Sequence, residues 1–166
     1  MLIADADGKH TKLVEELRAL GADVDQLQPH TLHTPSAIFV LSAFHGEQFE
    51  ALKSSGSQIV HVKAAIECAR DRRAIPPVQE PLRSLCFEGA SFISTGIKGE
   101  HKERLRAYTL GLGGTWCDSL HPPPTYVLAD STNTEKYQWA VGANVPVLKD
   151  DYVRACWESA RQLAPE

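Results

Sequence analysis

The chain lacks an excess of positive charge. It carries 17 Lys and Arg residues against 21 Asp and Glu residues, which gives a formal net charge of −4 at pH 7. A protein that binds nucleic acid over a broad surface normally needs the opposite balance, because the nucleic-acid backbone is polyanionic. The composition therefore argues against a general nucleic-acid binder, although it leaves room for one local basic pocket.

Long hydrophobic runs are also missing. No apolar stretch approaches the ~20 residues that a membrane-spanning helix needs. The first residues show no positively charged region followed by an apolar core and a small-residue cleavage site. We therefore expect neither a membrane association nor a secretory signal.

Cysteine is scarce and dispersed. The four cysteines are Cys68, Cys86, Cys117 and Cys156. None forms a CxxC pair, and their spacing is not typical of a zinc cluster. This pattern predicts four reduced, mostly buried thiols in an intracellular protein. We expect no metal and no cofactor, since His30 and His33 flank a loop in which solvation explains them better than metal binding does.

What the sequence does contain is an alternation of short apolar segments and helical patterns. Over the first 75 residues the order is strand, helix, strand, strand, helix, strand, helix. Residues 37–41 read AIFVL, a continuous apolar run of the kind expected in a buried parallel strand. Residues 13–20 place leucine and valine at helical spacing, and Gly21 ends that predicted helix. The first part of the chain is therefore predicted to be an α/β unit.

A proline-rich stretch follows this unit. Pro76, Pro77 and Pro81 predict a linker between folded parts. We place a first unit at residues 1–75, the linker at residues 76–85 and a second unit at residues 86–166. The second unit repeats the order of the first, with a helix expected to begin at Asn133 and a last helix expected from Asp150 to about Leu163.

The two units are predicted to be copies of one another. Residues 59–68 read IVHVKAAIEC and residues 147–156 read VLKDDYVRAC. Both segments place a strand, a turn, a helix and a cysteine at the same positions, with an offset of 147 minus 59, or 88 residues. Such self-similarity indicates an internal duplication, and hence two small α/β domains in tandem.

The second half also carries a longer ordered set of residues: Phe92, Thr95-Gly96, Arg104-Leu105, Gly113-Gly114, the TYVL strand from Thr125, Lys136, Ala140, Val147-Leu148 and the helix from Tyr152 to Cys156. Together they resemble a BRCT domain, with Tyr152 where the family usually has Trp. The first half resembles a degenerate BRCT repeat. The resemblance implies two repeats packed in tandem through helices, each a parallel four-stranded sheet flanked by helices, and it implies no catalysis.

The resemblance also implies a function. Many tandem BRCT modules bind phosphorylated Ser or Thr in partner proteins, whereas others act as scaffolds. They occur in DNA-damage, cell-cycle and chromosome-segregation proteins. We therefore expect a nuclear, non-enzymatic module that binds a phosphorylated protein or peptide. One hypothesis for its origin is the C-terminal BRCT module of a kinetoplastid kinetochore protein, and the initial Met with no tail leads us to expect a domain taken from a longer protein.

A phosphate site needs backbone N–H donors, a hydroxyl and a cation at a helix N-terminus. In the second half Thr95 supplies a hydroxyl, Gly96 lets the backbone N–H approach the anion, and Lys136 supplies charge near the next helix start. The BRCT resemblance assigns the phosphate ligands to these same three residues. Supporting donors around the turn are Lys98, His101 and Lys102.

The first half departs from this pattern. Ala4-Asp5 stands in place of Thr-Gly, Asp7 follows, and the 88-residue offset places Gln48 opposite Lys136. Carboxylates there would repel a phosphate. Tandem BRCT modules nevertheless usually hold the phosphate in their first repeat, so an alternative phosphate pocket is expected from Gly8, Lys9, Thr11 and Lys53.

Three other functions stay open on the sequence. A phosphate-independent scaffold would bind phosphorylated and plain partners equally. DNA binding is known among BRCT domains, but the net charge makes it less favoured here. A phosphatase of the haloacid-dehalogenase type would use Asp5 as nucleophile and Asp7 as general acid, with Mg²⁺ and with Thr95, Lys136 and Asp150-Asp151 in supporting roles. The phosphatase hypothesis leaves the duplication unexplained, so we expect no enzyme.

Overall fold

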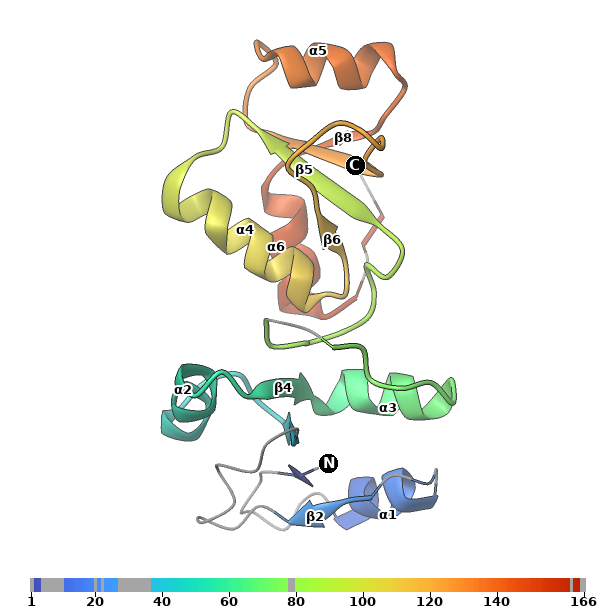
Figure 1. The fold of residues 1–166 in the computed structure, drawn as a ribbon. Coiled ribbons are helices and arrows are strands. Elements are labelled where there is room, and N and C mark those ends of the chain that lie inside the picture. Colours follow the sequence, from blue (N-terminus) through green and yellow to red (C-terminus); the bar gives the residue numbers. More distant parts are fainter. Residues whose placement is uncertain are drawn as a thin grey trace. The chain divides into compact units, whose positions relative to one another are not determined.

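A computed structural model describes residues 2–3, 11–19, 21, 23–26, 37–77, 80–161 and 163–164. The chain divides into two compact parts, Met1–Arg83 and Ser84–Glu166, named unit 1 and unit 2 below (Figure 1). Each is described by itself. The linker boundaries expected from the prolines, at residues 76 and 85, stay a prediction.

Unit 1 contains one parallel sheet of four strands. Its elements are β1 (Leu2–Ile3), α1 (Thr11–Ala19), β2 (Asp25–Gln26), β3 (Ile38–Leu41), α2 (Glu47–Ser54), β4 (Gln58–His61) and α3 (Val62–Arg70). The strand order is β2-β1-β3-β4, and every neighbouring pair is parallel. The continuous apolar run AIFVL therefore supplies a central strand, as predicted.

Unit 2 repeats this topology. Its elements are β5 (Ser91–Thr95), α4 (Gly99–Gly111), β6 (Thr115–Trp116), β7 (Tyr126–Ala129), α5 (Glu135–Gly142), β8 (Val147–Leu148) and α6 (Asp151–Ser159). The strand order is β6-β5-β7-β8, again all parallel. The predicted fold class, two parallel four-stranded sheets flanked by helices, is confirmed, and so is the order of elements in each copy.

The 88-residue offset holds in space as well as in sequence. Strands β3 and β7 begin at Ile38 and Tyr126, and helices α2 and α5 begin at Glu47 and Glu135, so both pairs differ by 88. The sheet register carries the same offset into the last strands, because Phe39 lies opposite Ile59 and Val127 lies opposite Val147. The offset therefore relates residues of unit 1 to residues of unit 2 from β3 onward. Gln48 and Lys136, 88 apart, are each the second residue of their helix.

The first strand needs a different offset, which the sheet register supplies. Ile3 lies opposite Val40 in unit 1, and Ser94 lies opposite Leu128, 88 residues beyond Val40, in unit 2. Ile3 therefore corresponds to Ser94. Continued along the sequence, this alignment places Ala4 and Asp5 opposite Thr95 and Gly96; Ala4, Asp5 and Asp7 lie outside the described residues, so the pairing stays a prediction.

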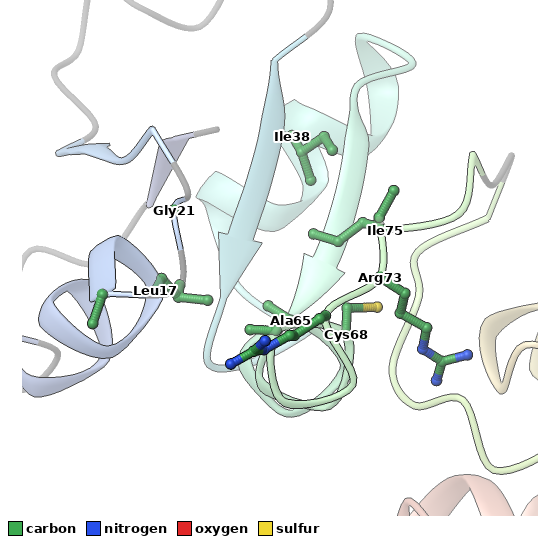
Figure 2. Close-up of a pocket in the computed structure, with 11 residues that line it drawn as sticks. Leu17, Gly21, Ile38, Ala65, Cys68, Arg73 and Ile75 are labelled. Carbon is green, nitrogen blue, oxygen red and sulfur yellow. The ribbon is translucent and has the colours of Figure 1, made fainter.

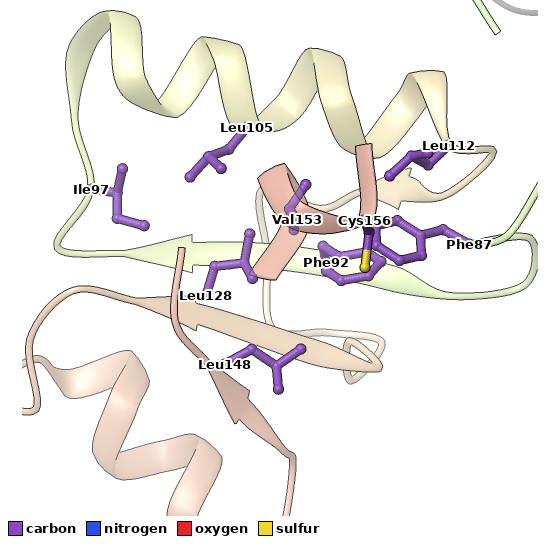
Figure 3. Packing of buried hydrophobic residues seen from close by; sticks show 9 residues of the cluster. All are labelled: Phe87, Phe92, Ile97, Leu105, Leu112, Leu128, Leu148, Val153 and Cys156. Carbon is purple, nitrogen blue, oxygen red and sulfur yellow. The ribbon is translucent and has the colours of Figure 1, made fainter. Parts of the chain in front are cut away.

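Alternation along the strands of unit 2 produces two apolar faces, because successive side chains of a strand point to opposite sides. Phe92 and Leu128 join the larger cluster, which packs under α4 and α6 (Figure 3). Ile93 and Val127 join Ala140 of α5 on the other face. Figure 1 shows α4 and α6 on one side of this sheet and α5 on the other.

The cysteines follow the same division into buried and partly exposed positions. Cys68 on α3 and Cys156 on α6 are buried at equivalent positions, 88 residues apart, and Cys86 and Cys117 are half-buried. All four are free thiols. Among the described residues, no helix is long and apolar enough to cross a membrane.

Two helix ends differ from the sequence prediction. Helix α5 begins one residue after Thr134, not at Asn133, because the Thr134 side chain caps it. Helix α6 ends at Ser159, before the predicted end near Leu163. Ala160 adopts a left-handed φ of 49° there, and the chain turns back so that the Tyr152 hydroxyl donates to the carbonyl of Leu163 at 2.9 Å.

The proline-rich stretch is partly packed. Leu82 is fully buried, its N–H donates to the Ile59 carbonyl at 2.9 Å, and its carbonyl accepts from the His61 N–H at 2.7 Å. The Gln58 side chain also donates to the Pro76 carbonyl at 2.9 Å. Residues within the predicted linker thus extend the edge of the unit 1 sheet beyond β4.

Candidate functional site

The candidate site lies at the carboxyl edge of the unit 2 sheet. Thr95 is the last residue of β5, Asp130 follows β7, and Lys149 follows β8. Because the three strands are parallel, the residues at their carboxyl ends gather at one edge, which is where open α/β sheets commonly bind ligands. The N-terminus of α5 reaches the same edge.

Thr95 ties the end of β5 to the start of α5. Its side-chain hydroxyl donates to the Thr134 hydroxyl oxygen at 2.9 Å, and that oxygen also accepts from the Tyr137 N–H at 3.3 Å. Thr134 is therefore the N-cap of α5. With Thr95 only 7% exposed, its hydroxyl is already used inside the fold. The contact brings Thr95 to the helix turn that carries Lys136. A phosphate-binding role for these residues stays a prediction.

Gly96 adopts a φ of 79°, a conformation that favours glycine. A Cβ at this position would collide with the Asp130 carboxylate, which lies directly against the turn. Asp130 itself is exposed. A carboxylate beside Gly96 disfavours an anion at this turn, because like charges repel. The sequence prediction missed both Asp130 and Thr134.

The signals for both residues were present. Asp130 is the acidic residue directly after the apolar TYVLA run, and the carboxyl end of a central parallel strand meets the end of its neighbour. Thr134 precedes a helix and is a preferred N-cap type. Neither signal reveals by itself that the two side chains converge on Thr95 and Gly96.

The predicted supporting donors Lys98, His101 and Lys102 all lie at the start of α4, but only His101 has a side-chain partner among the described residues. Lys98 is the exposed N-cap residue of α4, and Lys102 is half-buried one turn later. His101 lies with Nε2 2.6 Å from Asp150 Oδ2, which links α4 to the N-cap residue of α6. Asp150 makes no side-chain cap of its own helix.

The alternative pocket of unit 1 is described only in part. Gly8 and Lys9 lie outside the described residues, and Thr11 is the first residue of α1. Lys53 is exposed in the last turn of α2, where its ammonium lies 5.9 Å from the centre of the Phe49 ring. It is six residues after the start of α2, about 9 Å along the axis at ~1.5 Å per residue. Lys53 therefore sits at the opposite end of its helix from the position of Lys136. Binding there stays a prediction.

A cavity of about 530 Å³ lies beside Asp130, at the carboxyl ends of β7 and β8. Its lining includes the hydroxyl-bearing Ser131, Thr132 and Tyr137, together with Lys149 and Asp130. Asp130 thus borders both the turn and the cavity. The edge of unit 2 offers hydroxyls, a lysine and open volume within one depression.

The same corner of unit 1 is filled by rings. With the offset of 88, Thr132, Tyr137 and Lys149 correspond to Phe44, Phe49 and His61. Phe44 stacks on Phe49 with ring centres 5.3 Å apart and packs edge-on to His61 at 5.6 Å. This corner is therefore occupied by packing in unit 1 and hollow in unit 2.

His61 is a structural residue in that corner. Its Nδ1 accepts from the Lys63 N–H at 3.1 Å, which leaves Nε2 to donate to the Ser42 carbonyl at 2.9 Å. Burial, followed by the positive charge of Arg83, lowers the pKa of His61 below its usual 6.5. The neutral imidazole thus caps α3 and closes the corner.

The described residues show no metal-binding group of three or more His, Cys, Asp or Glu side chains. Of the residues cast in phosphatase roles, Thr95 is bonded to Thr134 and Asp150 to His101. Asp5 and Asp7, the predicted nucleophile and acid, lie outside the described part of the chain.

Comparisons with known proteins bear on the fold. No family model matches the chain. Protein ECT2 of Mus musculus is 25% identical over 123 residues, which cover 73% of this chain and 13% of that protein. Human Protein ECT2 is 23% identical over the same length, again 13% of the relative. The chain thus spans about an eighth of the curated relatives it matches.

Solved structures match the whole length. A crystal structure of yeast Rtt107 and Mms22 gives a TM-score of 0.50 at 16% identity, over 99% of this chain and 41% of that one. Rad4 BRCT1,2 in complex with a Crb2 phosphopeptide gives 0.47 at 15% identity, over 99% and 92%. The chain has the fold of a tandem BRCT module, which confirms the resemblance. These matches give no support to the kinetochore hypothesis.

Proposed function

We propose that the chain is a non-enzymatic protein-interaction module that binds a partner segment carrying phosphoserine or phosphothreonine at the carboxyl edge of unit 2. The observation that carries the proposal is the convergence of the Thr95-Gly96 turn with the capped start of α5 and Lys136. A nuclear setting in a DNA-damage, cell-cycle or chromosome-segregation assembly is part of the proposal and rests on the family resemblance.

The chemistry of this edge suits a phosphate in three respects. The first-turn N–H groups of α5 carry the positive end of the helix dipole. Lys136 lies in that turn, and Lys149 lines the adjoining cavity. Gly96 has no side chain, so its backbone becomes accessible to a ligand once the Asp130 carboxylate moves aside. A phosphate carries between −1.5 and −2 charges near pH 7, so the two lysines match it in number.

Asp130 is the obstacle to this binding mode. Its carboxylate occupies the space in front of Gly96, so a bound phosphate requires it to rotate away. The side chain is on an exposed residue, where rotamer changes are fast and cost little. Phosphate affinity at this edge should therefore be modest, and it should rise when the carboxylate is removed.

The test is a degenerate phosphoserine and phosphothreonine peptide library with an unphosphorylated copy. Lys136→Glu should abolish phosphate-dependent binding. Arg154→Glu is the matched control, because Arg154 is an exposed residue of α6 on the opposite face of the sheet from α5 and the charge change is identical. Equal losses from both variants, or none from Lys136→Glu, would move the site or remove it.

The same Asp130 observation favours a second candidate, a phosphate-independent interaction module. The Thr95 hydroxyl already donates to Thr134, and the Asp130 carboxylate lies against Gly96. The carboxyl edge of the unit 2 sheet therefore already carries a negative charge where a phosphate would bind. This candidate predicts equal affinity for phosphorylated and plain copies of every bound peptide. The library with its unphosphorylated control separates the two functions directly.

A further inference from the structure

Unit 1 contains an open groove of about 620 Å³ between α1, β3, α3 and the residues that follow α3 (Figure 2). Leu17 of α1 with Ala65 and Cys68 of α3 form its buried floor. Half-exposed Ile38 and Ile75 line its walls. This α1–α3 groove lies on the sheet face opposite the Phe44 corner described above, as α4 and α6 lie opposite α5 in unit 2.

Comparison of the two units shows which side chain unit 1 lacks at the groove. Trp157 of unit 2 corresponds to Ala69, since 157 minus 88 is 69. Trp157 stacks on Tyr108 of α4 with ring centres 4.8 Å apart and 21° between the rings, and it packs against the unit 2 core. Unit 1 therefore has a methyl group where unit 2 has an indole that fills the space between the two helices.

The surroundings of this position are otherwise retained. Leu163, which packs against the unit 2 core, corresponds to Ile75, since 163 minus 88 is 75. Ile75 lines the groove, as does the equivalent of the core cysteine, Cys68. Protein interiors are normally close-packed, so an apolar space of this size open to the surface is suited to a side chain supplied from outside.

The charge of the lining selects among possible occupants. Among the described lining residues, Arg72 and Arg73 are the charged ones, and none carries a carboxylate. Arg73 lies 3.4 Å from Asp71, and Arg72 is exposed beside the groove. A segment that places an aromatic ring in the groove would therefore gain from Asp or Glu residues on either side of that ring.

We propose that the α1–α3 groove of unit 1 binds a partner segment that inserts one aromatic side chain at Ala69, with acidic residues flanking it. The inserted ring takes the place that Trp157 occupies in unit 2. This interaction needs no phosphate, and it uses the unit opposite to the one assigned to the phosphopeptide, so either proposal can fail without the other.

The probe is a fluorescein-labelled peptide with one Trp between Asp and Glu residues, and the readout is fluorescence anisotropy. Ala69→Trp should fill the groove from within and weaken binding at least about tenfold, a difference of ~1.4 kcal/mol. Arg72→Glu should also weaken binding. Arg106→Glu, the same charge change at an exposed position of α4 in unit 2 and outside the groove, should leave binding within about twofold.

Two further measurements keep the test decisive if Ala69→Trp disturbs folding. Ala69→Leu is a smaller filler and should weaken binding in the same direction, with far-UV circular dichroism confirming the fold. In the unaltered protein, the peptide should shift the ¹³C-methyl resonances of Ala65, Ala69 and Ile75. Absence of binding, equal binding of a peptide with Trp replaced by Ala, or methyl shifts confined to unit 2 would each overturn the proposal.

Discussion

The hydrogen bond between the Thr95 and Thr134 hydroxyls determines whether the Thr95 hydroxyl is available to a ligand. Its contribution to the free energy of unfolding can be measured. If Thr95 donates to Thr134 within the fold, its hydroxyl is not free for a phosphate. Thr134→Ala removes the N-cap of α5 and also leaves the Thr95 hydroxyl without its acceptor. Thr95→Val removes the donor and leaves the cap in place. The two single variants and their combination form a double-mutant cycle.

The magnitudes follow from the two contacts. Loss of an N-cap costs about 1 kcal/mol. Stranding a hydroxyl on a residue only 7% exposed adds roughly another 1 kcal/mol, so Thr134→Ala should lower the free energy of unfolding by about 2 kcal/mol. Thr95→Val should cost about 1 kcal/mol. The double variant should cost about 1 kcal/mol less than the sum of the two, because it strands nothing.

Urea unfolding followed by tryptophan fluorescence is the assay. Trp116, Trp139 and Trp157 all lie in unit 2, so the signal reports that unit. If the two losses of unfolding free energy add within about 0.5 kcal/mol, the Thr95 and Thr134 hydroxyls are not coupled, because distant or unlinked groups behave that way. In that case the Thr95 hydroxyl would be available to a ligand, and the phosphate site would gain its third donor.

Three further predictions concern charge, pH and packing. Asp130→Asn should raise affinity for a phosphopeptide about fivefold, the scale of one charge contact near water, and leave its unphosphorylated copy unchanged in calorimetric titration. The lowered pKa of His61 means that unfolded chains bind more protons just below pH 6.5, so the folded state loses stability as the pH falls through that range. The hydrogen-exchange protection factor of Val60, corrected for the intrinsic exchange rate at each pH, should therefore fall, and His61→Gln should flatten the dependence. Leu128→Ala should lower the unfolding free energy of unit 2 by about 2–5 kcal/mol in urea, because Leu128 is fully buried in the core of Figure 3.

Much of the fold could be predicted because its signals are local or repeated. The AIFVL run predicted a buried parallel strand, and the IVHVKAAIEC and VLKDDYVRAC segments predicted a duplication, which the matching strand orders confirm. A repeat constrains both copies at once, so a weak pattern in one unit is supported by the other. This is why the element order was right even where single elements were short.

The two wrong helix ends lie where contacts with distant residues, not local sequence, determine where a helix begins or stops. Asn133 is a preferred N-cap residue by type, but α5 starts after Thr134. The Thr134 hydroxyl also accepts a hydrogen bond from Thr95, which lies 39 residues earlier in β5. Helical spacing could extend α6 to Leu163, but the chain turns back there to meet Tyr152. Neither contact is visible in local spacing.

The candidate site was predicted by residue type and corrected by geometry. Thr95 and the turn of Lys136 meet, but the Asp130 carboxylate lies over Gly96, and the sequence prediction did not include Asp130. The contrast between the ring-filled corner of unit 1 and the hollow corner of unit 2 depends on which residues pack together. It emerges only when the two sheets are compared residue by residue.

The most direct test of the central claim is an NMR titration of ¹⁵N-labelled protein with one phosphopeptide from the library and its unphosphorylated twin. We expect the difference between the two titrations to be concentrated at the amides of Gly96, Glu135 and Lys136, and to disappear in Lys136→Glu. Identical shifts from both peptides, or a difference located in unit 1, would contradict this expectation.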